Sequence, residues 1–136
     1  MFTPTGPANG VAKMYLDTHV VVWLYQKDAE RISAFAREQI ETQDMLISPA
    51  VLLEMEYLYE TGQITKKASE VFDLLREAIQ IELCEKPFSS VVKKALGVKW
   101  TRDPFDRIIT TQAAIDESTL LTKDATIHTY YENAVW

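Results

Sequence analysis

Short apolar segments alternate with segments of helical periodicity along nearly the whole of this chain. A buried strand needs only a few consecutive apolar residues, whereas a helix shows apolar residues three and four positions apart. Strands that alternate with helices form a parallel sheet whose connections are right-handed. We therefore expect an α/β fold with a central, mostly parallel sheet of four to five strands. The predicted strands are residues 11–16, 45–48, 79–84, 119–122 and, as the fifth, 134–136.

The segments between these strands carry signals for the start and the end of helices. Residues 20–25 follow the first apolar run closely, so a strand passes at once into a helix there. Ser48 and Pro49 suit the cap and the first residue of a helix, and Gly62 suits its end. Thr65 is expected to cap the next helix. The predicted helices after residue 25 cover residues 33–42, 49–61, 66–78, 89–96, 103–117 and 125–131.

Length and cysteine content indicate a single domain of a reducing compartment. A chain of 136 residues buries enough surface to fold without a disulfide, and Cys84, the only cysteine, has no internal partner. Cys84 lies in an apolar run, so we expect a buried thiol. The absence of a signal peptide and of a long apolar run favours a soluble, cytoplasmic protein. Residues 1–13 are expected to be an irregular extension or expression remnant, which leaves 14–136 as the domain.

The net charge of -6 argues against a protein that holds nucleic acid chiefly through a general positive field. It does not exclude a nuclease. An acidic site that binds a divalent metal ion carries negative charge locally, while a few placed lysine and arginine residues hold the phosphates.

Residues 101–112 contain two aspartates at what we expect to be the start of a helix. Asp103 suits the N-cap and Pro104 the first helical position. Asp106 falls at the third position, where its carboxylate meets the positive end of the helix dipole. The helix could lie close to a sheet because small residues follow one and two turns later, at Thr110, Ala113 and Ala114.

Carboxylates occur at the ends of several other predicted segments. Asp17 follows the first strand and Asp124 the fourth, and strand ends share one edge of a parallel sheet with the helix starts that follow them. Glu54 is placed less favourably, because it lies well inside its helix, at the border of the apolar stripe. Carboxylates gathered in this way repel one another, and a hard divalent cation such as Mg²⁺ relieves that repulsion. The chemistry that fits is metal-assisted hydrolysis of a phosphodiester.

Several of these residues also have other interpretations. A lone aspartate at a strand end or helix start is most often structural, and we keep that interpretation for Asp103. His19 and His128 have no neighbours at the spacing of a zinc site, although His19 could contact a substrate. A receiver domain or a haloacid-dehalogenase-like phosphatase is disfavoured, because Asp17 lacks the second aspartate that those sites need.

Four segments together resemble a known family. They are MYLDTHVVVWL (14–24), ISPAVLLEMEYL (47–58), WTRDPFDRIITTQA (100–113) and LLTKDATIHTYYENAVW (120–136). Each is weak alone, but their order along the chain is specific. From Met14 to Trp136 the chain resembles the PIN domain, and in particular the VapC-type ribonuclease toxins of bacterial toxin–antitoxin pairs. It departs from that pattern at residues 110–113, TTQA, where relatives more often have an alanine-rich run.

The resemblance implies a PIN-like three-layer α/β/α sandwich and a particular site. It implies a metal-dependent endoribonuclease that uses Mg²⁺ or Mn²⁺, cuts tRNA or another structured RNA, forms a homodimer and is inhibited by a cognate antitoxin. The alternative function is a catalytically inactive PIN module that acts as an RNA- or partner-binding scaffold. The implied catalytic and metal-binding residues are Asp17, Glu54, Asp106 and Asp124, with Thr18, Thr122 and Asp103 in support.

Basic residues near these acids are candidates for substrate contact. Lys99, Arg102, Arg107 and Lys123 could position phosphates, and Trp100 could stack on a base. The competing interpretation is that Arg107 pairs with an acid and Trp100 packs against a loop.

Overall fold

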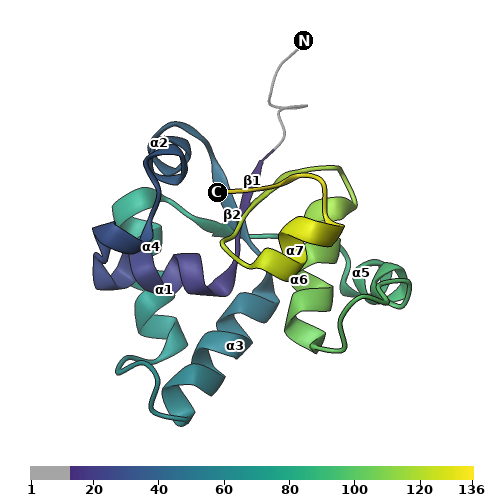
Figure 1. The fold of residues 1–136 in the computed structure, drawn as a ribbon. Helices are drawn as coiled ribbons and strands as arrows, with labels where there is room; N and C mark the ends of the chain where they lie inside the picture. The colour runs from purple at the N-terminus through teal and green to yellow at the C-terminus, as the bar shows by residue number, and fades with distance from the viewer. Residues whose placement is uncertain (1–12) are drawn as a thin grey trace.

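The computed structural model describes residues 13–136. Figure 1 shows the path of the chain. The elements are β1 (Met14–Leu16), α1 (Thr18–Gln26), the 3-10 helix η1 (Ala29–Arg31), α2 (Ala34–Thr42), β2 (Met45–Ile47), α3 (Pro49–Glu60), α4 (Ala68–Ile79), β3 (Glu82–Leu83), α5 (Phe88–Ala95), α6 (Pro104–Ala114), β4 (Thr119–Leu121), α7 (Ala125–Tyr130) and β5 (Ala134–Val135).

A parallel sheet lies at the centre of the molecule. Its five strands are ordered β3-β2-β1-β4-β5, and every neighbouring pair is parallel. Helices α1, α2 and α4 lie on one side of the strands, and α5, α6 and α7 lie on the other (Figure 1). The predicted α/β fold, with helices on both sides of a parallel sheet of four to five strands, is therefore confirmed. None of the described helices is both long enough and apolar enough to cross a membrane.

The direction of the helical connections changes between β1 and β4, which are neighbours in the sheet. The chain leaves β1 into α1 on one face and leaves β4 into α7 on the other face (Figure 1). The two helices therefore diverge above adjacent strands. In open α/β sheets such a point forms a crevice at the carboxyl ends of the strands, where ligands bind. The residues that follow β1 and β4 are those at which Asp17 and Asp124 occur.

Two predicted helix starts are confirmed in atomic detail, and one is wrong. The Ser48 hydroxyl accepts a hydrogen bond from the Ala50 amide at 3.0 Å, and Pro49 is the first residue of α3. Asp103 caps α6, as described below. Thr65 does not cap α4, which begins two residues later than predicted, at Ala68. The Ala68 amide instead donates to a carboxylate oxygen of Glu56 on α3, so a distant residue supplies the cap.

Several predicted boundaries move because turns are tighter than the apolar pattern suggests. The strand predicted at 79–84 is reduced to β3, because Ile79 ends α4 and Gln80 turns the chain with a left-handed φ of 61°. The helix predicted at 103–117 ends at Ala114, before a turn in which Glu117 has a φ of 56°. The prediction for residues 1–12 lies outside the described residues.

The core fills the spaces on both sides of the sheet. Its strand residues include Leu16, Ile47 and Leu121, all fully buried, and helices contribute Val51, Met55 and Ile109. Thr110 and Ala113 are buried as the narrow helix surface predicted, and Ala114 is half-buried. Polar residues stand at 110–112, where the resembling family more often has alanine, and they leave buried polar atoms in the core. Buried oxygens without a hydrogen-bond partner among the described residues occur on Thr110, Thr111 and Gln112.

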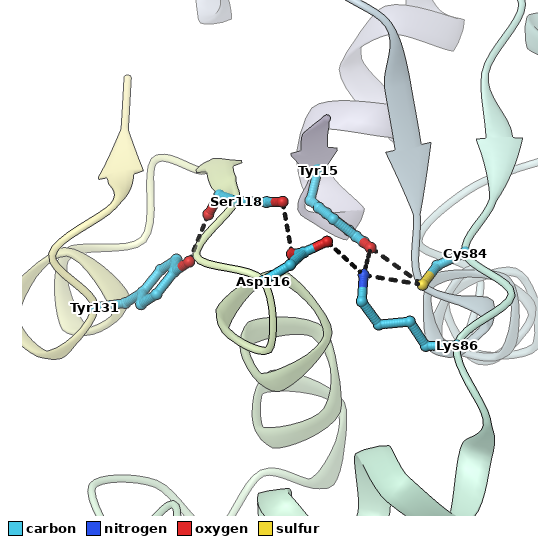
Figure 2. A network of polar contacts seen from close by, with 6 residues as sticks. All are labelled: Tyr15, Cys84, Lys86, Asp116, Ser118 and Tyr131. Atoms are coloured by element: carbon cyan, nitrogen blue, oxygen red, sulfur yellow. Dashed lines mark hydrogen bonds and ion pairs between the residues drawn. The ribbon is translucent and has the colours of Figure 1, made fainter. Parts of the chain in front are cut away.

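Past the carboxyl end of α6, a group of polar side chains that we name the polar clasp joins three parts of the chain (Figure 2). Lys86, from the loop after β3, donates to the Tyr15 hydroxyl on β1 and forms a 3.0 Å ion pair with Asp116. Tyr15 in turn donates to the sulfur of Cys84 at 3.1 Å, and Ser118 donates to Asp116 at 2.7 Å. The predicted burial of Cys84 is confirmed, since the residue is 5% exposed.

The polar clasp perturbs the ionisation of two of its members in opposite directions. Burial, assisted by the contact with Cys84, raises the pKa of Tyr15 far above its ordinary value, so the phenol stays neutral. Burial also opposes ionisation of Asp116, but hydrogen bonds from Ser118 and Lys86 outweigh it and lower the pKa of that carboxyl. The clasp therefore holds an ionised pair against a neutral phenol and fixes the turn between α6 and β4.

Replacing Lys86 with methionine tests the clasp. The Lys86→Met protein loses the ammonium that serves both Tyr15 and Asp116, and we expect a loss of about 1–2 kcal/mol in the free energy of unfolding. Lys13→Met is the matched control, because its 3.9 Å ion pair with Asp44 is exposed. That control should change stability by less than about 0.5 kcal/mol. Equal losses in urea denaturation of the two variants would contradict a stabilising role for the clasp.

Candidate active site

An open pocket of about 440 Å³ lies at the carboxyl edge of the sheet, beside the ends of β1 and β4. All four acids predicted to act together face it. Its lining consists of Asp17, His19, Val20, Trp23, Glu54, Asp103, Asp106, Lys123 and Asp124. The residues come from four separate parts of the sequence, so the fold brings together what the chain keeps apart.

Asp17 is the most rigidly held of the acids. It caps α1 and is only 8% exposed. One carboxylate oxygen accepts from the Thr18 amide at 2.8 Å, and the other accepts from the Thr122 hydroxyl at 2.6 Å. Burial raises the pKa of Asp17, and these two hydrogen bonds lower it only in part. The site thus holds a carboxylate whose charge is poorly solvated but whose orientation is fixed.

Thr122 joins the acids that follow β1 and β4. Its side chain is fully buried, and its hydroxyl both donates to Asp17 and accepts from the Asp124 amide at 3.0 Å. Asp124 then caps α7 by accepting from the Ile127 amide at 2.9 Å. A single hydroxyl therefore connects the two carboxylate-bearing residues Asp17 and Asp124.

Glu54 reaches the pocket from α3. Its Oε1 accepts a hydrogen bond of 2.5 Å from the hydroxyl of Thr18. Burial raises the pKa of Glu54, and the charges of Asp17 and Asp103 raise it further, whereas the Thr18 bond opposes the shift. Glu54 was the acid with the least favourable predicted position, because it lies well inside its helix. The contact with Thr18 holds it at the same pocket as Asp17.

Asp106 is positioned by the cap of its own helix. Asp103 accepts from the amides of Phe105 and Asp106, at 2.8 and 3.1 Å, so the prediction of Asp103 as the N-cap is confirmed. The Asp106 carboxylate stands in the first turn of α6. Burial, followed by repulsion from Asp103, Asp17, Asp124 and Glu54, raises the pKa of Asp106 to about 7.

No basic side chain of the described residues forms an ion pair with this acidic pocket. The ion pairs of the described residues are Lys13–Asp44, Arg31–Asp28 and Lys86–Asp116. Lys123 lines the pocket, but it makes no ion pair within residues 13–136. No ion pair within residues 13–136 therefore offsets the repulsion between the acids. A bound cation would remove that repulsion and would restore the ionised form of Asp106.

The donors of the pocket match a hard divalent cation. They are carboxylate oxygens, which Mg²⁺ and Mn²⁺ prefer, and no cysteine is among them. Within residues 13–136, no three His, Cys, Asp or Glu side chains are grouped closely enough to hold a metal ion together. Mg²⁺ usually takes only one or two protein carboxylates and completes its shell with water and substrate phosphate. The residues therefore fit such an ion by their chemistry and by the number of ligands it needs.

The four predicted substrate-contact residues take three different positions relative to the pocket. Lys123 lines the pocket, and Lys99 and Arg102 are exposed outside its lining. Arg107 is half-buried and donates to the Thr101 carbonyl at 2.9 Å, so it braces the loop before α6. Arg107 therefore has a structural role. The competing interpretation expected an acid as its partner, but the partner is a backbone carbonyl.

Trp23 and Val20 line the pocket and were missed from the sequence. Both lie on α1, and Trp23 is one helical turn beyond His19, whose ring centroid lies 6.1 Å from its own. The charge of His19 lowers the pKa of both Asp17 and Glu54. A helix that starts directly after Asp17 places positions 19, 20 and 23 on one face. A sequence prediction that started the helix at Thr18 would have placed Val20 and Trp23 at the pocket.

The pKa of Asp106 predicts how stability depends on pH without metal. An unfolded aspartate has a pKa near 3.8, so between pH 4 and pH 7 the folded protein holds a proton that the unfolded chain has lost. The free energy of unfolding should therefore fall as pH rises through this window in EDTA. Asp106→Asn should reduce that fall and should be more stable than the wild type at pH 8. Asp73→Asn, at an exposed position of α4, serves as the control.

Urea denaturation at pH 4.5 and pH 8 measures this difference. A wild-type stability that rises across the window, or an Asp106→Asn profile parallel to that of the wild type, would show that the folded protein does not raise the pKa of Asp106.

Comparisons with known proteins agree with the architecture. The family model described as the PIN domain matches residues 14–133. No curated protein matches the chain in sequence. Among solved structures, the chain is similar to one in the crystal structure of VapBC2 from Rickettsia felis bound to a DNA fragment from their promoter. The TM-score is 0.63 at 16% identity, over 90% of this chain and 95% of that chain, which shows a shared fold. With a family match over nearly all of its described residues, the chain belongs to the PIN domain family.

Proposed function

We propose that the protein is a metal-dependent endoribonuclease of the VapC type, which hydrolyses phosphodiester bonds in tRNA or another structured RNA. The observation that carries the proposal is the pocket at the end of β1 and β4, where Asp17, Glu54, Asp106 and Asp124 converge without an ion-pair partner among the described residues. Membership of the PIN domain family supports nuclease chemistry at such a pocket.

Asp17 and Asp106 have specific roles in this proposal, and Glu54 and Asp124 support them. Asp17 and Asp106 would hold Mg²⁺ or Mn²⁺, with Glu54 and Asp124 beside them, and the bound ion would supply activation of water and neutralisation of charge on the phosphate. Asp17 presents a carboxylate whose direction is set by Thr18 and Thr122. Asp106 releases its proton when positive charge enters the pocket, because the neighbouring acids that raise its pKa are then screened.

Basic residues in the pocket and around it bind and orient the RNA in this proposal. Lys123 lies at the pocket and attracts the phosphate to be cut. Lys99 and Arg102 lie outside the pocket and hold phosphates further along the strand. These contacts compensate for the net charge of -6, which opposes binding of RNA at a distance.

The partners belong to the same proposal. The similar Rickettsia felis structure is of VapBC2 with a promoter DNA fragment. By likeness to that system we propose a cognate antitoxin that inhibits the nuclease by covering the pocket, a homodimeric toxin, and a cytoplasmic location. A small open reading frame directly upstream of the gene that encodes a DNA-binding fold would support this arrangement.

A second candidate function is a catalytically inactive PIN module that binds RNA or a protein partner. The observation that favours it is that no three potential ligands in the described part of the chain are grouped around a common metal position. This candidate predicts RNA binding without cleavage, at every concentration of Mn²⁺.

Charge-removing substitutions at two neighbouring aspartates of the pocket test the nuclease directly. With Mn²⁺, the wild type should cut RNA, and Asp17→Asn and Asp106→Asn should each lower the rate by at least about 100-fold. Asp103→Asn is the matched control, since asparagine caps a helix as well as aspartate does. It should keep activity within about tenfold of the wild type. Gel analysis of a labelled RNA measures all four proteins, and equal cleavage by all four would reject the assignment.

A further inference from the structure

Two aromatic rings from distant parts of the chain are stacked on each other, outside the lining of the acidic pocket. Trp100 belongs to the loop before α6, and Tyr130 is the last residue of α7. Their ring centroids are 5.4 Å apart and their planes differ by 4°, an offset parallel stack. Trp100 is half-buried and packs against the core, whereas Tyr130 is 59% exposed. Tyr130 thus remains more than half exposed although Trp100 is stacked against it.

The two rings lie on the same segments as two acids of the pocket. Asp124 caps α7 at one end and Tyr130 ends it at the other, a distance along the helix of about 9 Å. Trp100 stands three residues before Asp103, which lines the pocket. An aromatic surface at this distance is within reach of a nucleotide next to one whose phosphate lies in the pocket.

The segment that carries Trp100 is basic, although the chain is acidic. Residues 86–102 contain no aspartate or glutamate, in a chain with 20 acids against 14 lysines and arginines. Besides Lys86 of the polar clasp, its cations are Lys93, Lys94, Lys99 and Arg102, and all four are exposed. None of the four forms an ion pair within the described residues. Cations that flank an open aromatic ring suit a strand whose phosphates and bases alternate.

We propose that Tyr130, supported from beneath by Trp100 and flanked by Lys99 and Arg102, stacks on an unpaired base of the RNA next to the phosphate in the acidic pocket. This inference rests on the proposed function and specifies its substrate as a single-stranded segment. Stacking on an aromatic ring requires an exposed base face and is tolerant of base identity, while the cations hold the backbone. A base inside a duplex has both faces covered and cannot bind in this way.

Fluorescence of short RNAs that contain 2-aminopurine tests the stack on the full-length protein. Binding is measured with Ca²⁺, which we expect to support binding without cleavage, and again with EDTA. Wild type should quench the base, and Tyr130→Ala and Tyr130→Leu should lower affinity by about 5- to 100-fold and abolish quenching. Tyr130→Phe keeps the ring and should behave as the wild type does. Phe35→Ala, at an exposed aromatic residue of α2, is the control for loss of a ring elsewhere.

The cations are tested by salt dependence in the same assay. Arg102→Gln and Lys99→Gln should each reduce the slope of log affinity against log salt concentration by about one. Lys66→Gln, which changes an exposed lysine before α4, should leave the slope unchanged. Duplex RNA of the same sequence should bind more weakly than the single strand and should show no dependence on Tyr130.

The outcomes separate this inference from the proposed function. Cleavage of RNA by the wild type with unchanged affinity and quenching in Tyr130→Ala overturns the inference alone. Tyr130-dependent quenching without any cleavage in Mn²⁺ upholds the inference and rejects the nuclease. If Tyr130→Ala leaves RNA affinity intact but alters the oligomeric state in sedimentation, the ring contacts protein and the inference fails. It fails also if the wild type binds no single-stranded RNA.

Discussion

Repulsion between carboxylates at one edge of the sheet is the constraint on which the rest of this structure depends. Asp17, Glu54 and Asp106 all have raised pKa values, in each case because burial opposes the charge, with neighbouring acids adding to the effect. The fold tolerates these charges because hydroxyls and amides hold them in place. Thr18 and Thr122 together link Glu54, Asp17 and Asp124 into one connected set. Such an arrangement opposes the ionised form of these acids, and a bound cation would relieve that opposition.

The sheet provides the geometry for that arrangement with very short strands. Because β1 and β4 are adjacent and their following helices lie on opposite faces, the residues after both strands meet at one crevice. The polar clasp is built on the same two regions, since it joins Tyr15 of β1 to the turn that precedes β4 (Figure 2). The acidic edge and the polar clasp are therefore both built on the strand pair of β1 and β4.

Much of this could be predicted from the sequence, because the signals were local. The alternation of strands and helices gave the sheet, and the position of Asp17 after a strand and of Asp106 after the Asp103 cap placed both acids at one edge. Glu54 could be placed only by resemblance, because its contact with Thr18 joins residues 36 positions apart. Thr65 looked like a cap, but Glu56 supplies that bond from another helix. No local pattern could have revealed the stack of Trp100 on Tyr130, which joins the loop before α6 to the end of α7.

The central claim is that the converging carboxylates form a divalent-metal site. Calorimetric titration of Mn²⁺ into the protein at pH 8 tests it without any assumption about RNA. The account predicts saturable binding by the wild type, near-normal binding by Asp103→Asn, and loss of binding by Asp106→Asn. No binding by the wild type, or equal binding by wild type and Asp106→Asn, would contradict the account.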